Sequence, residues 1–381
     1  MGSFSGSLSP LSASELGAKV IAEAIKNTGL EMAEVDEVIM GNVLPAGLGQ
    51  NPARQAMLKA CLPYDVGATT INKVCGSGLK AVMMGSQAIL SKDAEVVVAG
   101  GMESMSQAPY YLDKARFGIR MGNVPLIDGM IHDGLWDIIN DFHMGYTAEL
   151  VSKKYGVSRE AMDEFACHSY EKVLQAMAAG KFDREIVAVE VPQKKGNPVF
   201  VKVDECPRET TMESLSKLKP VFKPDGKVTA GNSSKISDGA AAVLLMSAEK
   251  VKEKNLTPLA RVVAQGSAGV ELKDVLVAPI YSIPRVAKKA GLKMEEIDLH
   301  EINEAFAAST VAVIKTLGLD PMRVNVNGGA IALGHPIGAS GARILVALLN
   351  AMQERKARMG MASLCLGGAE AVSLIIENQQ V

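Results

Sequence analysis

"HPIGASGARILVALLNAMQERKARMGMASLCLGGAEA", residues 335–371, contains the pattern that decides the fold. A histidine precedes a glycine-rich turn, a helical run follows, and a short apolar run then ends in Cys365 and a Gly-Gly pair. The same order occurs nearer the N-terminus, where "CGSGLKAVMMGSQAIL" (75–90) is followed by "VVVAGGMES" (96–104). Self-similarity at a long spacing indicates a duplicated unit.

A third match supports the duplication, because "AIKNTGLEMAEVDEVIMGN" (24–42) resembles "VAKKAGLKMEEIDLHEIN" (286–303). The three matches keep the same order, at offsets of 262, 263 and 267 residues (291 − 29, 340 − 77 and 367 − 100). They pair Gly29 with Gly291, Ser77 with Ser340, and Gly100 with Gly367.

Each copy alternates helical runs with short apolar runs that read as buried strands, which predicts an α/β fold. We therefore expect two pseudo-symmetric doubly wound halves. The first half comprises 1–104 with 236–256, and the second comprises 257–381. Residues 105–235 have no counterpart in the repeat and mix helical with alternating patterns, so they are predicted to form an inserted α+β loop domain.

The second copy opens with the apolar run "LARVVAQG" (259–266), which is typical of a strand. Its counterpart in the first copy falls at or before the first residues of the sequence. We expect the first half to lack this strand.

Composition narrows the class of protein. Hydrophobic residues make up 48% and charged residues 22% of 381 residues, and the formal net charge is −2. This balance is typical of a globular protein and argues against a nucleic-acid partner. No signal peptide or membrane-spanning run is expected. The five cysteines are scattered and lack zinc-site spacing, which favours free thiols, no bound metal and a cytoplasmic location.

Two side chains at strand-to-helix junctions are candidates for chemistry. Cys75 lies where an apolar run ends and a helix begins, and the positive helix end favours a thiolate. His335 lies at nearly the same place in the second copy, so a two-fold axis between the halves would let the histidine activate the cysteine. The plainer interpretations are a buried apolar thiol and a helix-capping imidazole.

Two more candidates end predicted strands of the second half. Cys365 precedes a Gly-Gly turn, where backbone N–H groups can stabilise an oxyanion, and Asn303 in "EINEAFAAS" can hold a water or a carbonyl. Each is equally compatible with an ordinary structural role, as a core residue or as a helix cap. Among the remaining candidates, Cys167 is expected to pack in the interior and His168 to be exposed.

These motifs together resemble the thiolase family. The motifs are "NKVCGSGLKAV", "AGGMESMSQAPY", "TAGNSSKISDGAA", "EINEAFA", "NGGAIALGHPIGASGAR" and the "CLGG" after a strand. The resemblance spans essentially the whole chain and implies a five-layered αβαβα fold of two similar halves plus a loop domain. It also implies an acyltransferase that uses acetyl-CoA, acetoacetyl-CoA and CoA as substrates and products, with no permanently bound cofactor and no metal.

The resemblance assigns roles to the candidates. Cys75 would be the acylated nucleophile, His335 its activator, and Cys365 the acid/base at the substrate α-carbon. Asn303 would hold a water that forms one oxyanion hole with His335, and the N–H groups of Cys75 and Gly367 would form the other.

For coenzyme A, the family motifs place Ser234 on the pantetheine and Arg208 beside the adenine nucleotide. His143 and Met144 match the "HMG" of short-chain biosynthetic members and would line the pantetheine and the acyl pocket. Relatives of this kind are commonly homotetramers, and the family forms dimers in general.

The chain departs from the family pattern at its last loop, where two glycines are replaced by Ala369 and Ala371. An alanine at either position strains the loop if the backbone there needs a positive φ angle. Three hypotheses follow. The protein is a short-chain thiolase, a broader 3-ketoacyl-CoA thiolase or related decarboxylating enzyme, or a non-catalytic protein that binds acyl-CoA or lipid.

Overall fold

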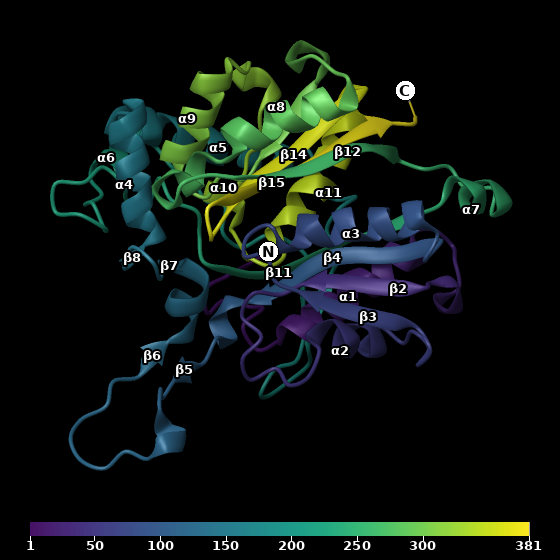
Figure 1. Ribbon diagram of the computed structural model, residues 1–381, viewed down its shortest axis with the longest axis horizontal. Coiled ribbons are helices and arrows are strands. Elements are labelled where there is room, and N and C mark those ends of the chain that lie inside the picture. Colours follow the sequence, from purple (N-terminus) through teal and green to yellow (C-terminus); the bar gives the residue numbers. More distant parts are fainter. Residues whose placement is uncertain (381) are drawn as a thin grey trace.

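The computed structural model, which describes residues 1–380, has two larger β-sheets that lie one above the other (Figure 1). Helices cover the outer face of each sheet, and two further helices fill the space between them. The layers therefore follow in the order αβαβα, which confirms the predicted five-layered fold.

The sheet of the first half has the strand order β1-β11-β4-β2-β3. β2 runs parallel to β3 and β4, whereas β11 is antiparallel to β4. On its outer face lie α1 (Ala13–Lys26), which begins with a capping box from Ser12, and α2 (Pro52–Lys59). The strands are β1 (Gly2–Ser3), β2 (Glu37–Gly41), β3 (Gly67–Ile71), β4 (Val96–Ser104) and β11 (Ser237–Met246).

The sheet of the second half has the order β12-β15-β14-β13, and α8 (Pro279–Ala290) and α9 (Ala307–Leu317) lie on its outer side. β13 is parallel to β14, and β15 is antiparallel to β14 and to β12. These four strands match β1, β11, β4 and β2 of the first sheet in order and direction, and β3 has no counterpart among the described strands of the second sheet. The strands are β12 (Ala260–Gly269), β13 (Leu299–Ile302), β14 (Met359–Leu366) and β15 (Glu370–Asn378).

The middle layer consists of α3 (Ser77–Ser91) and α11 (Ser340–Arg355), the two helices that follow the glycine-rich turns. Their first turns meet closely, since a Cβ added at Gly78 would lie 2.7 Å from the Ala342 nitrogen and 3.1 Å from the Gly338 oxygen. Glycine is required for this approach. The positive ends of two helix dipoles therefore converge at one place between the halves.

The repeat deduced from the sequence needs one correction. Asp36 accepts hydrogen bonds from the backbone at the start of β4, at Glu95 and Val96, and Asp298 accepts the equivalent bonds at the start of β14, from Arg358 and Met359. These strands therefore match at an offset of 263 (359 − 96), which agrees with the helix match. The pairing of Gly100 with Gly367 is wrong by four residues.

The outermost strands of the two sheets differ in length. β12 runs alongside β15 from Ala260 to Gly269, whereas β1 pairs only Gly2 and Ser3 with β11. The backbone of β11 beyond these pairs has no neighbouring strand on that side within the described residues.

Between β4 and β11 the chain forms a lobe at the left of Figure 1. It contains the helices α4 (Met144–Tyr155) and α5 (Arg159–Ala178) and the paired strands β9 (Val189–Val191) and β10 (Val199–Val201), in agreement with the α+β mixture expected for residues 105–235. As expected, Cys167 is buried and His168 is exposed. In the second half, the equivalent strands β14 and β15 are joined by a short turn instead of a lobe.

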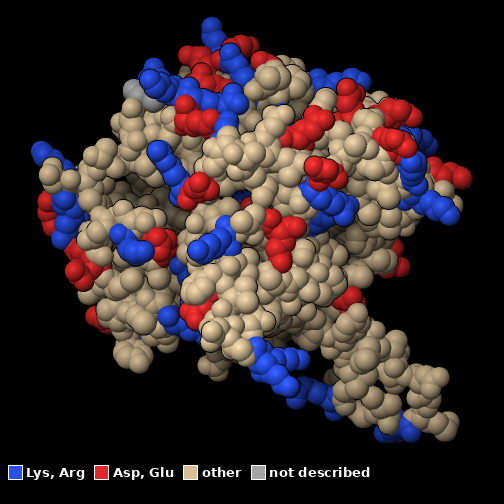
Figure 2. Space-filling view, turned by 180° about the vertical axis from the view of Figure 1, so that it is seen from behind, with Lys and Arg blue, Asp and Glu red and all other residues tan. Residues whose placement is uncertain are grey.

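An arm, residues 110–128, projects from this lobe as a hairpin of β5 (Tyr110–Tyr111) and β6 (Ile127–Asp128) with a long loop. Figure 2 shows it at the lower right as a projection that is tan over most of its visible surface with a few Lys or Arg side chains, while charges of both signs intermingle over the rest of that face. Its loop exposes large apolar side chains, with Phe117 88% and Met121 98% accessible. Within residues 1–380, no helix has the length and apolar character that crossing a bilayer would require.

Candidate active site

Cys75 lies in the nucleophile turn, residues 72–76, which joins β3 to α3. The Lys73 N–H donates to the Ser77 Oγ (2.8 Å), and the Val74 N–H donates to the Asn72 Oδ1 (2.9 Å). Val74 has a φ of 46°, a left-handed conformation that is unusual for a β-branched residue. This turn places the Cys75 thiol, which retains partial exposure, just before the first turn of α3.

The resting Cys75 is a thiol and not the thiolate expected from the helix end. Burial raises the pKa of Cys75 to about 12, although the N–H groups of Gly367 and of Cys75 itself oppose the shift. Desolvation of the charged sulfur therefore outweighs the favourable dipoles. This nucleophile needs a base.

Cys365 ends β14 directly opposite this turn and is 4% exposed. Burial raises the pKa of Cys365, and the charge on Cys75 raises it further, so the two sulfurs are electrostatically coupled. The sequence separates these thiols by 290 residues (365 − 75). The fold brings them together at the boundary between the halves.

The hairpin turn, residues 366–370, follows Cys365. The backbone angles in and after this turn show which of the two alanines at glycine positions is strained. Gly368 has a φ of 85° and Ala369 a φ of 65°, so the alanine does occupy a left-handed conformation. Ala371 lies in β15 and is unstrained. An L-residue in this region costs about 1–2 kcal/mol. Gly367 nevertheless keeps its N–H directed at Cys75.

His335 is buried, and its hydrogen bonds define its tautomer. The Ser340 Oγ–H donates to the Pro336 oxygen (2.9 Å), so the Ser340 Oγ accepts from the His335 Nδ1–H at 2.5 Å. The Nε2 lone pair then accepts a long hydrogen bond from the Asn303 Nδ2, at 3.5 Å. Burial lowers the pKa of His335 to about 3, so the ring is neutral and its Nε2 carries a lone pair.

Asn303 follows β13 directly and is 3% exposed. Its amide nitrogen faces His335, while its Oδ1 is buried with no hydrogen-bond partner among the described residues. The structure therefore brings Asn303 to His335, and Cys75 to Cys365 and Gly367. The turn after His335 joins the two groups, because Ile337 lies in the apolar cluster against which Cys75 packs.

Glu103 is a residue of this region that the sequence did not single out. It is fully buried, and it accepts four hydrogen bonds that join the Gly338 turn to the segment after β2. Burial raises the pKa of Glu103 to about 7, against the effect of these donors. An acid directly after a buried Gly-Gly strand is the signal that would have revealed it. The donors are the N–H groups of Val43, Leu44 and Gly338 and the Asn42 Nδ2.

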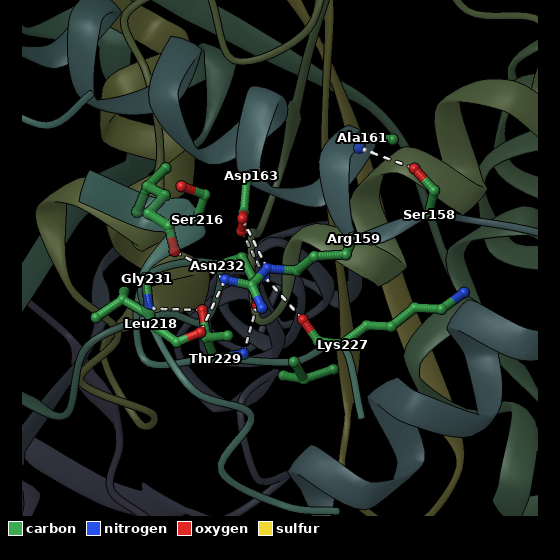
Figure 3. Close-up of polar contacts among 12 residues, drawn as sticks. Ser158, Arg159, Ala161, Asp163, Ser216, Leu218, Lys227, Thr229, Gly231 and Asn232 are labelled. Atoms are coloured by element: carbon green, nitrogen blue, oxygen red, sulfur yellow. Dashed lines mark hydrogen bonds and ion pairs between the residues drawn. The ribbon is translucent and has the colours of Figure 1, made fainter. Parts of the chain in front are cut away.

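Ser234 is carried by the segment 227–234, which a polar network fastens to α5 (Figure 3). Arg159 donates to Asp163 (Nε–Oδ2, 2.6 Å), and Asp163 accepts from the Asn232 Nδ2 (2.8 Å). Asn232 in turn accepts from the Thr229 N–H (2.8 Å), which closes the loop. The Ser234 N–H bonds to the backbone two residues after Asn303, at 3.1 Å. The inserted lobe thus holds this segment beside the site.

His143 and Met144 begin α4 and face the same region. The His143 ring stacks on Phe222 at 4.8 Å, and Phe222 makes an edge contact with Phe306 at 6.2 Å. The His143 Nδ1 accepts from the Gly145 N–H (3.0 Å), so its Nε2 carries the proton, and burial lowers its pKa. Met144 packs against the cluster that contains Cys365 and Phe306.

Arg208 lies farther out, on the exposed surface of the lobe. It faces Tyr170 and Lys235, and burial followed by the charge of Arg208 lowers the pKa of Lys235 to about 8. Positive charge therefore gathers at the outer end of the region that contains Ser234.

A thiol packed against the turn that carries a neutral imidazole, a second buried thiol, and N–H donors at a junction of helix ends define an enzyme of thiol-based acyl transfer. The chain belongs to the thiolase family. The thiolase N-terminal domain matches residues 1–249, and the thiolase C-terminal domain matches residues 256–378.

Similar proteins agree with this assignment. An acetyl-CoA acetyltransferase of Pseudomonas aeruginosa is 56% identical over 99% of this chain and 96% of its own length. An acetyl-CoA acetyltransferase of Cupriavidus necator is 55% identical over 100% of this chain and 97% of its own length. The crystal structure of the Bacillus anthracis acetyl-CoA acetyltransferase is 43% identical, covers 99% of this chain and 95% of its own, and has a TM-score of 0.97.

Proposed function

We propose that this protein is an acetyl-CoA C-acetyltransferase that reversibly condenses two acetyl-CoA into acetoacetyl-CoA and CoA through an acetyl-cysteine. The observation that carries the proposal is the meeting of two thiols, the partly exposed Cys75 and the buried Cys365, whose turns touch at Gly367, with the Gly367 N–H directed at Cys75. One thiol suffices for acyl transfer, and the second supplies the proton chemistry that carbon–carbon bond formation requires. The names of the full-length relatives support the same activity.

In the first half-reaction the Cys75 sulfur attacks the thioester carbonyl of acetyl-CoA. The His335 Nε2 takes the thiol proton and returns it to the departing CoA sulfur, so the products are acetyl-Cys75 and CoA. The carbonyl oxygen carries the developing negative charge and is stabilised by the N–H groups of Cys75 and Gly367. One such donor is worth roughly 3 kcal/mol of barrier.

In the second half-reaction Cys365 first releases its thiol proton to solvent, and the resulting thiolate removes a proton from the methyl group of a second acetyl-CoA. The enolate oxygen is stabilised by a water held at the Asn303 Oδ1, because the Nε2 of the neutral His335 ring has no proton to donate. The enolate carbon attacks acetyl-Cys75, the C–C bond forms, and the C–S bond to Cys75 breaks. The methyl proton passes from Cys365 to the Cys75 sulfur, and Cys365 regains a proton from solvent, which restores the enzyme.

Coenzyme A would enter along the inserted lobe. In this proposal Ser234 bonds the pantetheine, Arg208 lies beside the nucleotide, and His143 donates its Nε2 proton into the channel. Met144 limits the length of the acyl group. The support is their arrangement from the catalytic residues outward to the exposed surface.

The direct test is incubation with acetyl-CoA, followed by peptide mass spectrometry. We expect an acetyl adduct on Cys75 that disappears when CoA is added. A protein that binds acetyl-CoA without forming the adduct would be the non-catalytic alternative, and the proposal would be wrong.

A broader 3-ketoacyl-CoA thiolase is the second candidate. One observation favours it: a relative in Staphylococcus aureus, 49% identical over 99% of this chain, is named a probable acetyl-CoA acyltransferase. The apolar wall of Met144, Phe222 and Phe306 argues for short chains. Rates for 3-ketoacyl-CoA of four, six and eight carbons decide between the two. We expect a steep fall after four carbons, and a shallower one in Met144→Ala.

We propose further that the protein is a cytoplasmic homo-oligomer, a tetramer built from dimers. The arm supports this assembly, because its exposed Phe117 and Met121 form an apolar projection that a monomer leaves in water. All five cysteines are free, which is typical of a reducing compartment.

A further inference from the structure

An ion pair joins the two turns that carry the thiols. Lys73, two residues before Cys75, pairs through its Nζ with the Glu370 Oε2 at the end of the hairpin turn. The partners are 297 residues apart and belong to different halves. Their side chains are 26% and 39% exposed, so the pair lies at the rim of the site and not in the core.

The same two turns also touch at Gly367. The Gly367 N–H faces the Cys75 sulfur, and a Cβ added at Gly367 would lie 3.0 Å from the Val74 Cγ1. The spacing between the turns therefore sets how well this N–H reaches the sulfur. A displacement of one ångström is enough to change the rate of a positioned reaction by about a hundredfold.

Each turn contains one residue in an unfavourable backbone conformation. Val74 and Ala369 both occupy left-handed conformations, at φ 46° and 65°, and each costs about 1–2 kcal/mol. Local hydrogen bonds hold the nucleophile turn, and the Val270 N–H holds the hairpin turn at the Ala369 oxygen (2.9 Å). Contacts between the turns are needed to hold one against the other.

We propose that Lys73 and Glu370 are positioning residues, which hold the Gly367 N–H against the Cys75 sulfur and thereby set the reactivity of that thiol. The proposal rests on the proposed function only in taking Cys75 as the nucleophile. Lys80, at the start of α3, is the other cation that faces Glu370. Loss of Glu370 leaves two lysines on one side with no counter-charge between the turns.

The test compares Glu370→Gln, Lys73→Met and the exchanged pair Lys73→Glu/Glu370→Lys. Glu354→Gln is the matched control, because Lys181 and Glu354 form an ion pair of similar exposure, 27% and 41%. Three quantities are measured: the rate of iodoacetamide alkylation at the Cys75 peptide between pH 7 and 10, the kcat and KM for acetoacetyl-CoA thiolysis, and the urea midpoint. Peptide-level detection separates Cys75 from the exposed Cys61.

We expect Glu370→Gln and Lys73→Met to slow alkylation of Cys75 about threefold or more and to lower kcat roughly tenfold, with KM within twofold. The exchanged pair should recover most of both losses, and the control should match the wild type. The proposal would be overturned if Glu370→Gln left the alkylation rate and kcat unchanged, whether or not the urea midpoint fell. The proposal would also be refuted if the two single variants and the exchanged pair lost the same amount of kcat and alkylation rate while remaining folded, because the ion pair would then not be what holds the turns together. Altered alkylation in a protein without turnover would instead contradict the proposed function and leave this inference standing.

Discussion

Replacing Cys365 with alanine should separate the two half-reactions. Acetyl transfer to Cys75 uses His335 and the Gly367 N–H, and none of these contacts involves the Cys365 sulfur. Removal of the methyl proton has no other base in the proposed mechanism, and positioned acid–base catalysis contributes about 10²–10⁴-fold. We therefore expect condensation and thiolysis to fall by about a thousandfold, while exchange of the acetyl group between acetyl-CoA and labelled CoA stays within about tenfold.

Stability should change little, because the substitution removes one sulfur from a site that is 4% exposed, at a cost on the order of 1 kcal/mol. The assay pairs label exchange into acetyl-CoA with acetoacetyl-CoA cleavage on one preparation, and the urea midpoint is the control for folding. Washout of deuterium from the acetyl methyl group gives a third readout, which should disappear with condensation. Equal loss of exchange and condensation in a folded variant would refute the division of labour between the two thiols.

Three further predictions test the surroundings of the site. Burial raises the pKa of Glu301 to about 8, so the folded protein holds this proton more tightly than the unfolded chain does. Wild-type stability then falls as the pH rises from about 5 to 8.5, and the advantage of Glu301→Gln in urea midpoint should grow over that range; a constant difference would contradict it. Asp163→Asn leaves Arg159 without its charged partner, so we expect a loss of about 3 kcal/mol and a raised KM for acetyl-CoA with a smaller change in kcat. A folded variant with normal KM would show that the network does not position the coenzyme segment. Phe117→Glu with Met121→Glu should convert tetramers to dimers in light scattering; an unchanged mass would exclude the arm as the interface.

Much of the architecture followed from the sequence because duplication leaves a visible trace. The turns after β3 and before α11 carry the same small residues, since two helices must approach there within backbone distance. The strand match failed, however, because Gly100 and Gly101 lie within β4, whereas Gly367 and Gly368 lie in the turn after β14. Only the Asp36 and Asp298 hydrogen bonds, which mark where β4 and β14 begin, establish the register.

The site residues named from the sequence stay a prediction, whereas the expected electrostatics of Cys75 differ from those of the structure. The position of Cys75 before a helix suggested a thiolate, but desolvation depends on how the other half covers the sulfur, and no local pattern reports that. The same limit applies to Glu103 and to the pairing of Lys73 with Glu370, which come from distant segments. For Ala369 and Ala371 the sequence only raised the question of strain, and the structure answers it, with Ala369 at a positive φ and Ala371 in a regular strand.

The coupling between the thiols limits the charge that the two sulfurs can carry together. Burial disfavours a charge on either sulfur, and a charge on Cys75 further disfavours one on Cys365, so the empty site does not hold both as thiolates. In the proposed mechanism the two charges never coincide, because Cys75 is a neutral thioester while the Cys365 thiolate acts as the base. The Cys75 sulfur leaves as a thiolate only after Cys365 has taken up the methyl proton. The covalent intermediate thus separates the two charges in time, which is what a site that cannot hold both requires.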